Sequence, residues 1–109
     1  MAYFMVRVEL HELGSSQKPT WDDYNRLHVA MQKHRYYRVI QSDKGVWYHL
    51  PHANYTATSD SMTRADILNE VVKVVNSVWS KAGKLVTEGP SNWEGLKPAS
   101  ASEVQQLTK

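Results

Sequence analysis

Cysteine is absent from this chain of 109 residues, and its five glycines are scattered along it. The lack of cysteine excludes disulfides, thiolate zinc sites, iron–sulfur clusters and cysteine nucleophiles. The scatter of the glycines excludes a glycine-rich loop that cradles phosphate. Apolar runs are only a few residues long, so we expect no membrane insertion. No charged stretch followed by an apolar one opens the chain as a secretory signal would, and we expect a cytoplasmic protein.

Neither charge dominates, because 13 Lys and Arg residues against 11 Asp and Glu residues give a net charge of +2. This balance does not by itself predict a nucleic-acid-binding protein, although it allows a local basic patch. Hydrophobic residues at 41% and charged residues at 22% are ordinary for a globular domain that buries a core. We expect a single domain over residues 1–96 and a flexible C-terminal tail over residues 97–109, where large apolar residues are few.

The spacing of apolar residues predicts both strands and helices. Apolar and polar residues alternate over residues 3–11, which is the period of a half-buried strand. Two apolar stripes at helical spacing follow Thr20 and Thr63, and each threonine has an aspartate three residues later, as in a capping box. The predicted elements are a strand over 3–11, a helix over 21–33 or 34, strands over 36–40 and 46–50 with an extended run over 54–58, a helix between 63 and 83, and a strand over 85–87.

The order of these elements is β-α-β-β-α-β, which belongs to the α+β class. Two helices cover only one face of a four-stranded sheet, so we predict a ferredoxin-like fold, with a four-stranded antiparallel sheet and two helices on one face. The right-handed crossover rule places the first and third strands side by side in the centre. The other face of the sheet is then open, or a partner covers it.

The open face of the predicted sheet carries Tyr3, Met5 and Arg7 from the first strand. If Trp47 and His49 point the same way, this face is too aromatic to remain bare. A surface on which RNA bases stack is one interpretation, but the glycine- and phenylalanine-rich third-strand signature of RNA-recognition-motif domains is missing. We favour the other interpretation, a homodimer that forms through this face.

Arg26 and His28 flank Leu27, which belongs to the apolar stripe of the first predicted helix. Cleavage of RNA without a metal needs a base for the 2′-hydroxyl, an acid for the leaving 5′-oxygen and a cation for the phosphorane charge. Histidine and arginine are suitable for these tasks, so Arg26 and His28 are candidate catalytic residues. The alternative is that both lie on a solvated flank of the helix.

The densest basic run follows this helix, over residues 33–38, and two tyrosines are interleaved with its cations. Such tyrosines stack on unpaired bases in RNA-binding proteins while the cations hold phosphate. The candidate RNA-binding residues are therefore Arg7, Lys33, Arg35, Tyr36 and Arg38. The alternative for the run is a solvated helix end.

His49 and His52 have the spacing of a metal-binding pair, but Pro51 lies between them. In an extended chain, a spacing of three residues puts the two side chains on opposite faces. No acidic cluster stands beside them in the sequence. We therefore expect a loop or strand-end pair, and we predict no metal and no small-molecule cofactor.

Over residues 3–88 the chain resembles the GhoS-type antitoxin family of type V toxin–antitoxin systems. The likeness lies in the β-α-β-β-α-β order and is greatest over residues 26–31 and 37–40. Members of that family are endoribonucleases that cleave the messenger RNA of a small membrane-active toxin, and their ferredoxin-like fold is that of CRISPR-associated nucleases. An Arg-Leu-Arg stretch in their first helix is implicated in activity. Arg26 matches its first arginine, and His28 replaces the second.

The resemblance implies an endoribonuclease antitoxin in which Arg26 and His28 contact phosphate, with Arg7, Arg35 and Arg38 as supporting cations. Two alternatives stand beside it, a non-catalytic dimerisation or protein-interaction module and a single-stranded RNA-binding module that does not cleave. Convergence of Arg26, His28 and Arg38 on one groove would favour RNA, and their divergence would favour the module.

Overall fold

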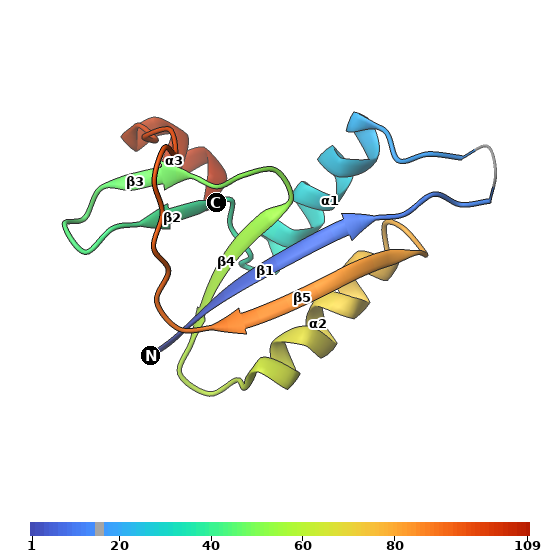
Figure 1. The fold of residues 1–109 in the computed structure, drawn as a ribbon, viewed down its shortest axis with the longest axis horizontal. Coiled ribbons are helices and arrows are strands. Elements are labelled where there is room, and N and C mark those ends of the chain that lie inside the picture. The colour runs from blue at the N-terminus through green and yellow to red at the C-terminus, as the bar shows by residue number, and fades with distance from the viewer. Residues whose placement is uncertain (15–16) are drawn as a thin grey trace.

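The computed structural model describes residues 1–14 and 17–109 and has a mixed α+β fold (Figure 1). Its elements are β1 (Ala2–Leu10), α1 (Trp21–Lys33), β2 (Val39–Gln41), β3 (Trp47–His49), β4 (Asn54–Ser59), α2 (Arg64–Asn76), β5 (Ala82–Glu88) and α3 (Ala101–Leu107). The α+β class predicted from the sequence is confirmed. The sheet arrangement and the C-terminal region differ from the prediction.

The main sheet has three antiparallel strands in the order β4-β1-β5, so β1 lies in the centre. The alternation along β1 turns Phe4, Val6, Val8 and Leu10 towards the helices, where all four are buried. Helices α1 and α2 lie side by side on that face of the sheet and complete the core (Figure 1). Each large apolar side chain that is buried in this way contributes about 1.5–3 kcal/mol relative to exposure.

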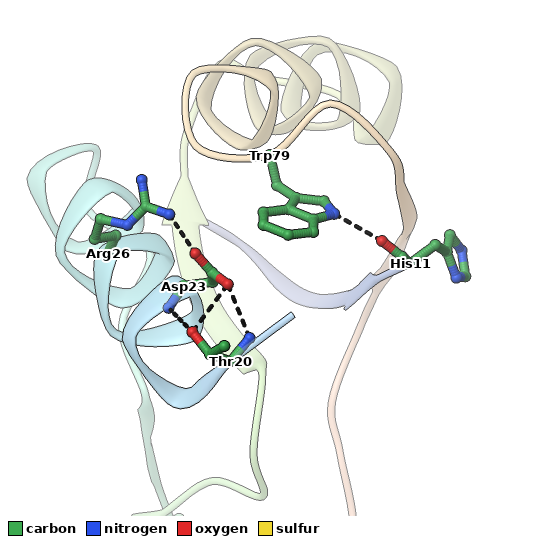
Figure 2. A network of polar contacts seen from close by, with 5 residues as sticks. All are labelled: His11, Thr20, Asp23, Arg26 and Trp79. Atoms are coloured by element: carbon green, nitrogen blue, oxygen red, sulfur yellow. Dashed lines mark hydrogen bonds and ion pairs between the residues drawn. The ribbon is translucent and has the colours of Figure 1, made fainter. Parts of the chain in front are cut away.

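Both main helices begin at the capping boxes that the sequence predicts. The hydroxyls of Thr20 and Thr63 accept from the backbone amides of Asp23 and Asp66, and the aspartates accept from the threonine amides in return. Each box supplies acceptors for two amide groups that have no partner within the helix. Figure 2 shows the box of α1, in which Asp23 also accepts from Arg26.

A buried tryptophan joins the end of the α2 region to the end of β1. The indole N–H of Trp79 donates to the backbone oxygen of His11 over 2.7 Å (Figure 2). The ring itself is 6% exposed and packs in the core. This contact satisfies the polar atom of a large buried ring, which a buried tryptophan requires.

The predicted four-stranded sheet does not form, because β2 and β3 pair with each other in a separate two-stranded sheet. The strand that pairs with β1 is β4, the extended run at 54–59, and not the predicted strand at 46–50. One isolated bridge, between Tyr37 and Thr56, connects the chain before β2 to β4. The Thr56 hydroxyl also donates to the Val39 backbone oxygen over 2.6 Å, and the chain then departs from the main sheet.

Two turns on either side of the β2–β3 hairpin have a residue with positive φ. Arg35 has a φ of 68° and redirects the chain at the end of α1, so that Tyr36 enters the core. Ala53 has a φ of 59° and ends the turn between β3 and β4. Positive φ is uncommon in residues other than glycine, and neither position carries the glycine or asparagine that would announce it in the sequence.

The C-terminal region, predicted to be a flexible tail, packs on the β2–β3 hairpin and contains a helix. The amide of His49 donates to the Lys97 oxygen over 2.8 Å, and the amide of Ala99 donates to the Trp47 oxygen over 2.9 Å. Helix α3 then follows its N-cap residue, Ser100, and lies beside the hairpin (Figure 1). Strand β5 is also longer than the predicted residues 85–87.

Candidate functional site

A pocket of about 370 Å³ opens where α1, the β2–β3 hairpin, the turn after β3 and α3 meet. Three histidines and one arginine line it together with a glutamate from α3. We call this site the histidine pocket. Its lining residues are His28, Arg38, His49, Leu50, Pro51, His52, Ala53, Ser102, Glu103, Gln106 and Leu107.

His28 lies at the inner side of the histidine pocket and is 7% exposed. Its Nδ1 atom is 2.6 Å from the hydroxyl oxygen of Tyr55, which is fully buried. Burial, with help from the positive charge of Arg38 and from His52, lowers the pKa of His28 to about 4. Burial likewise raises the pKa of Tyr55. At neutral pH, His28 is therefore an uncharged ring held by an uncharged phenol.

His49 forms a dyad with a carboxylate. Its Nε2 atom lies 2.9 Å from Oε2 of Glu103, which α3 brings to the pocket. Hydrogen bonds from the Ser100 amide and hydroxyl and from His49 lower the pKa of Glu103. The carboxylate is thus ionised at neutral pH and only accepts, so Nε2 of His49 must carry the hydrogen. In the neutral ring, Nδ1 is then free to accept a proton.

His52 is exposed and lies in a turn that hydrogen bonds from the Asn54 side chain hold in place. The side-chain amide of Asn54 donates to the backbone oxygens of His52, over 2.9 Å, and Pro51, over 3.3 Å. The His52 ring centroid lies 4.4 Å from that of Tyr24 and 5.7 Å from that of His28. The turn and these rings therefore place a solvent-accessible imidazole at the pocket.

Arg38 supplies the guanidinium of the histidine pocket and is half-buried. It is the only Lys or Arg among the pocket's described lining residues. Within residues 1–14 and 17–109, it forms no ion pair with a carboxylate. The pocket therefore holds one guanidinium and one carboxylate that are not paired with each other, and the guanidinium is the group that suits an anionic ligand.

Arg26 does not join His28, although both are candidate catalytic residues. Two positions along a helix turn by about 200°, so the two side chains point in nearly opposite directions. Arg26 is exposed, pairs with Asp23 and belongs to the cap of α1 (Figure 2). It lines a second groove, with Val29 and Lys33 among its neighbours. Of the three groups whose convergence would favour RNA, His28 and Arg38 converge and Arg26 does not.

The other candidate RNA-binding residues lie apart from the histidine pocket. Tyr36 is 1% exposed and donates its hydroxyl to Oε1 of Glu70 over 2.7 Å. Its ring therefore belongs to the core and offers no face to a base, which corrects the stacking role predicted for it. Lys33 and Arg35 are exposed near the end of α1, and Arg7 is exposed on the open face of the main sheet.

The open face of the main sheet carries less aromatic surface than predicted. Tyr3 and Leu85 are its large exposed apolar side chains, and Arg7 pairs with Leu85 across β1 and β5. Trp47 and His49 do not contribute to it, because β3 belongs to the other sheet. The homodimer through this face stays a prediction.

Comparison of the chain with protein-family models, with curated proteins and with solved structures gives no match in any of the three. In the described part of the chain, no helix is long and apolar enough to span a membrane. No three histidine, aspartate or glutamate side chains of residues 1–14 and 17–109 are grouped to hold a metal ion. The geometry of the histidine pocket is therefore the basis for a functional hypothesis.

Proposed function

We propose that the chain is an endoribonuclease that cleaves single-stranded RNA without a metal, in the histidine pocket. The observation that carries this proposal is the meeting of His49, His52 and Arg38 in one pocket, with a carboxylate that orients His49. These groups match the base, acid and cation that transfer of a phosphodiester to its own 2′-hydroxyl requires. The histidine pocket replaces the pair Arg26 and His28 as the proposed catalytic centre.

The proposed reaction assigns one step to each group. Nδ1 of His49 accepts the proton of the 2′-hydroxyl, and the 2′-oxygen forms a bond to phosphorus. The bond from phosphorus to the 5′-oxygen breaks, and protonated His52 donates a proton to that leaving oxygen. Arg38 stabilises the negative charge on the phosphorane oxygens. The products are a 2′,3′-cyclic phosphate and a 5′-hydroxyl.

His28 has a different task in this proposal. Its ring is neutral at neutral pH, so it does not supply the positive charge that the sequence prediction assigned to this position. It packs edge-on against His52, with the two rings inclined by 86°. We assign it the positioning of His52.

The topology also supports a derivative of the ferredoxin-like fold. Strands β5, β1 and β4 lie in that order, and the Tyr37–Thr56 bridge adds the chain before β2 at the β4 edge. Counted along the chain, this is the order fourth, first, third, second, with the first and third strands in the centre. This strand order agrees with the fold that the resemblance to the GhoS-type family implies, and from that resemblance we retain, as part of the proposal, an antitoxin that acts on the messenger RNA of a toxin.

The test is cleavage of an end-labelled single-stranded RNA in the presence of EDTA by the wild type and by His49→Ala, His52→Ala and Arg38→Ala. General acid–base groups contribute about 100- to 10,000-fold each, so each histidine variant should lose at least about 100-fold in rate. His34→Ala is the matched control, because His34 is an exposed histidine outside the histidine pocket. Wild-type rates in both histidine variants would refute the assignment. RNA binding without cleavage would refute the catalytic part and leave an RNA-binding module.

A further inference from the structure

Trp21 is an exposed indole at the first position of α1, and 74% of its surface is accessible. The helix does not need this side chain to begin, because Thr20 and Asp23 form the complete capping box. The side chain also lies outside the described core. Its exposure therefore has no explanation in the packing of the domain.

Within the described residues the exposed indole makes one aromatic contact, and that contact leads to the histidine pocket. The ring centroid of Trp21 lies 5.2 Å from that of His52, with the planes inclined by 73°. His52 lines the pocket and also contacts His28. Trp21, His52 and His28 thus form a row of rings that runs from the exposed surface to the interior. Because the indole meets His52 in an edge-on arrangement, the contact leaves indole surface exposed.

We propose that Trp21 is a positioning residue on which one unpaired nucleobase of the RNA stacks, beside the phosphate held in the histidine pocket. This inference rests on the proposed function and specifies its substrate. An exposed indole beside a site for phosphate is the combination with which proteins hold single-stranded nucleic acid. A base inside a duplex has both faces covered by its neighbours and cannot stack in this way. The substrate is therefore RNA that is unpaired next to the scissile bond.

The experiment measures binding of two labelled oligoribonucleotides by fluorescence anisotropy at low salt and constant pH. One is oligo(A), and the other has the same ribose–phosphate backbone with abasic positions throughout. The proteins are the wild type, Trp21→Ala, Trp21→Phe and Arg38→Ala. Val29→Ala is the matched control. Val29 is an exposed apolar residue on the same helix, but it lines the second groove and not the histidine pocket.

We expect Trp21→Ala to bind oligo(A) at least about fivefold more weakly than the wild type, since stacking of a base on an aromatic ring is worth that much or more. Trp21→Phe should restore part of the affinity, and Val29→Ala should leave it unchanged. The abasic strand should bind equally to the wild type and to Trp21→Ala. Arg38→Ala should weaken the binding of both strands.

Failure of the Trp21 inference and failure of the proposed function give different binding results. If Trp21→Ala binds oligo(A) like the wild type while Arg38→Ala binds it weakly, the Trp21 inference is wrong and the proposed pocket stands. If Trp21→Ala weakens both strands equally, the indole acts on the structure and not on a base, which also overturns the inference. If the wild type binds neither strand, the proposed function fails and the inference fails with it.

Discussion

Acidification from pH 7 to pH 5 should destabilise the protein through His28. A histidine in the unfolded chain has a pKa of about 6.5, whereas burial lowers the pKa of His28 to about 4 in the fold. Between these values the unfolded chain binds a proton that the folded chain does not, so stability is lost as the pH falls below about 6.5. The full shift gives a loss of about 2 kcal/mol between pH 7 and pH 5, and solvent screening that halves the shift leaves about 1 kcal/mol.

Urea unfolding followed by circular dichroism measures this loss. With a urea slope of about 1–2 kcal/mol per molar, the midpoint should fall by about 1 M from pH 7 to pH 5. His28→Gln keeps a polar side chain that does not titrate, so its midpoint should change much less over the same range. Three carboxyls with lowered pKa, those of Asp23, Asp66 and Glu103, act in the same direction but chiefly below this window. Equal pH dependence of the midpoint in the wild type and in His28→Gln would refute the conclusion that His28 is buried in its neutral form.

The remaining predictions concern α3, the open sheet face and a helix cap. Glu103→Gln should slow single-turnover RNA cleavage at least about tenfold, because an amide no longer fixes the hydrogen on Nε2 of His49; an unchanged rate in a folded variant would contradict the dyad. Leu85→Glu should convert the predicted homodimer to a monomer in light scattering, since the variant places a charge in an apolar contact. A wild type that is monomeric at the same concentration would contradict the predicted dimer. Thr63→Ala should lower the free energy of unfolding by about 1 kcal/mol through the lost cap of α2, and Thr63→Ser, which keeps the hydroxyl that accepts from the Asp66 amide, serves as its control. Equal midpoints for these two variants would contradict the role of the cap.

Local sequence patterns were sufficient for most of the elements. The alternation of β1 and the capping boxes of α1 and α2 depend on residues close in sequence, and all three were predicted. The α3 helix was missed, although Ser100 and Glu103 have capping-box spacing. None of its residues is buried, so the apolar stripe that marks a helix in a sequence is lacking.

The sheet arrangement depends on features that leave no local pattern. Arg35 and Ala53 have a positive φ and the Thr56 hydroxyl donates to the Val39 oxygen in the region where the observed strand pairing departs from the predicted one. Each strand keeps its extended character whichever partner it takes, so periodicity does not distinguish the arrangements.

The candidate site was only partly visible in the sequence for the same reason. His28, Arg38 and the pair His49 and His52 were each noted, but they lie in three stretches of the sequence that only the fold brings together. Arg26 and His28 are two positions apart in the sequence and face different grooves. Glu103 comes from the helix that was missed, and with it the orientation of His49 was missed as well.

The most direct test of metal-free cleavage through a 2′-hydroxyl uses one RNA with a single mapped cleavage site and the same RNA with a 2′-deoxynucleotide on the 5′ side of that bond. Both are incubated with the wild type and with His49→Ala in EDTA, and the product ends are identified by mass spectrometry. The account predicts a 2′,3′-cyclic phosphate from the all-ribose strand with the wild type alone, and no cleavage at the deoxy position although that strand still binds. Cleavage at the deoxy position, or a requirement for a divalent cation, would contradict it.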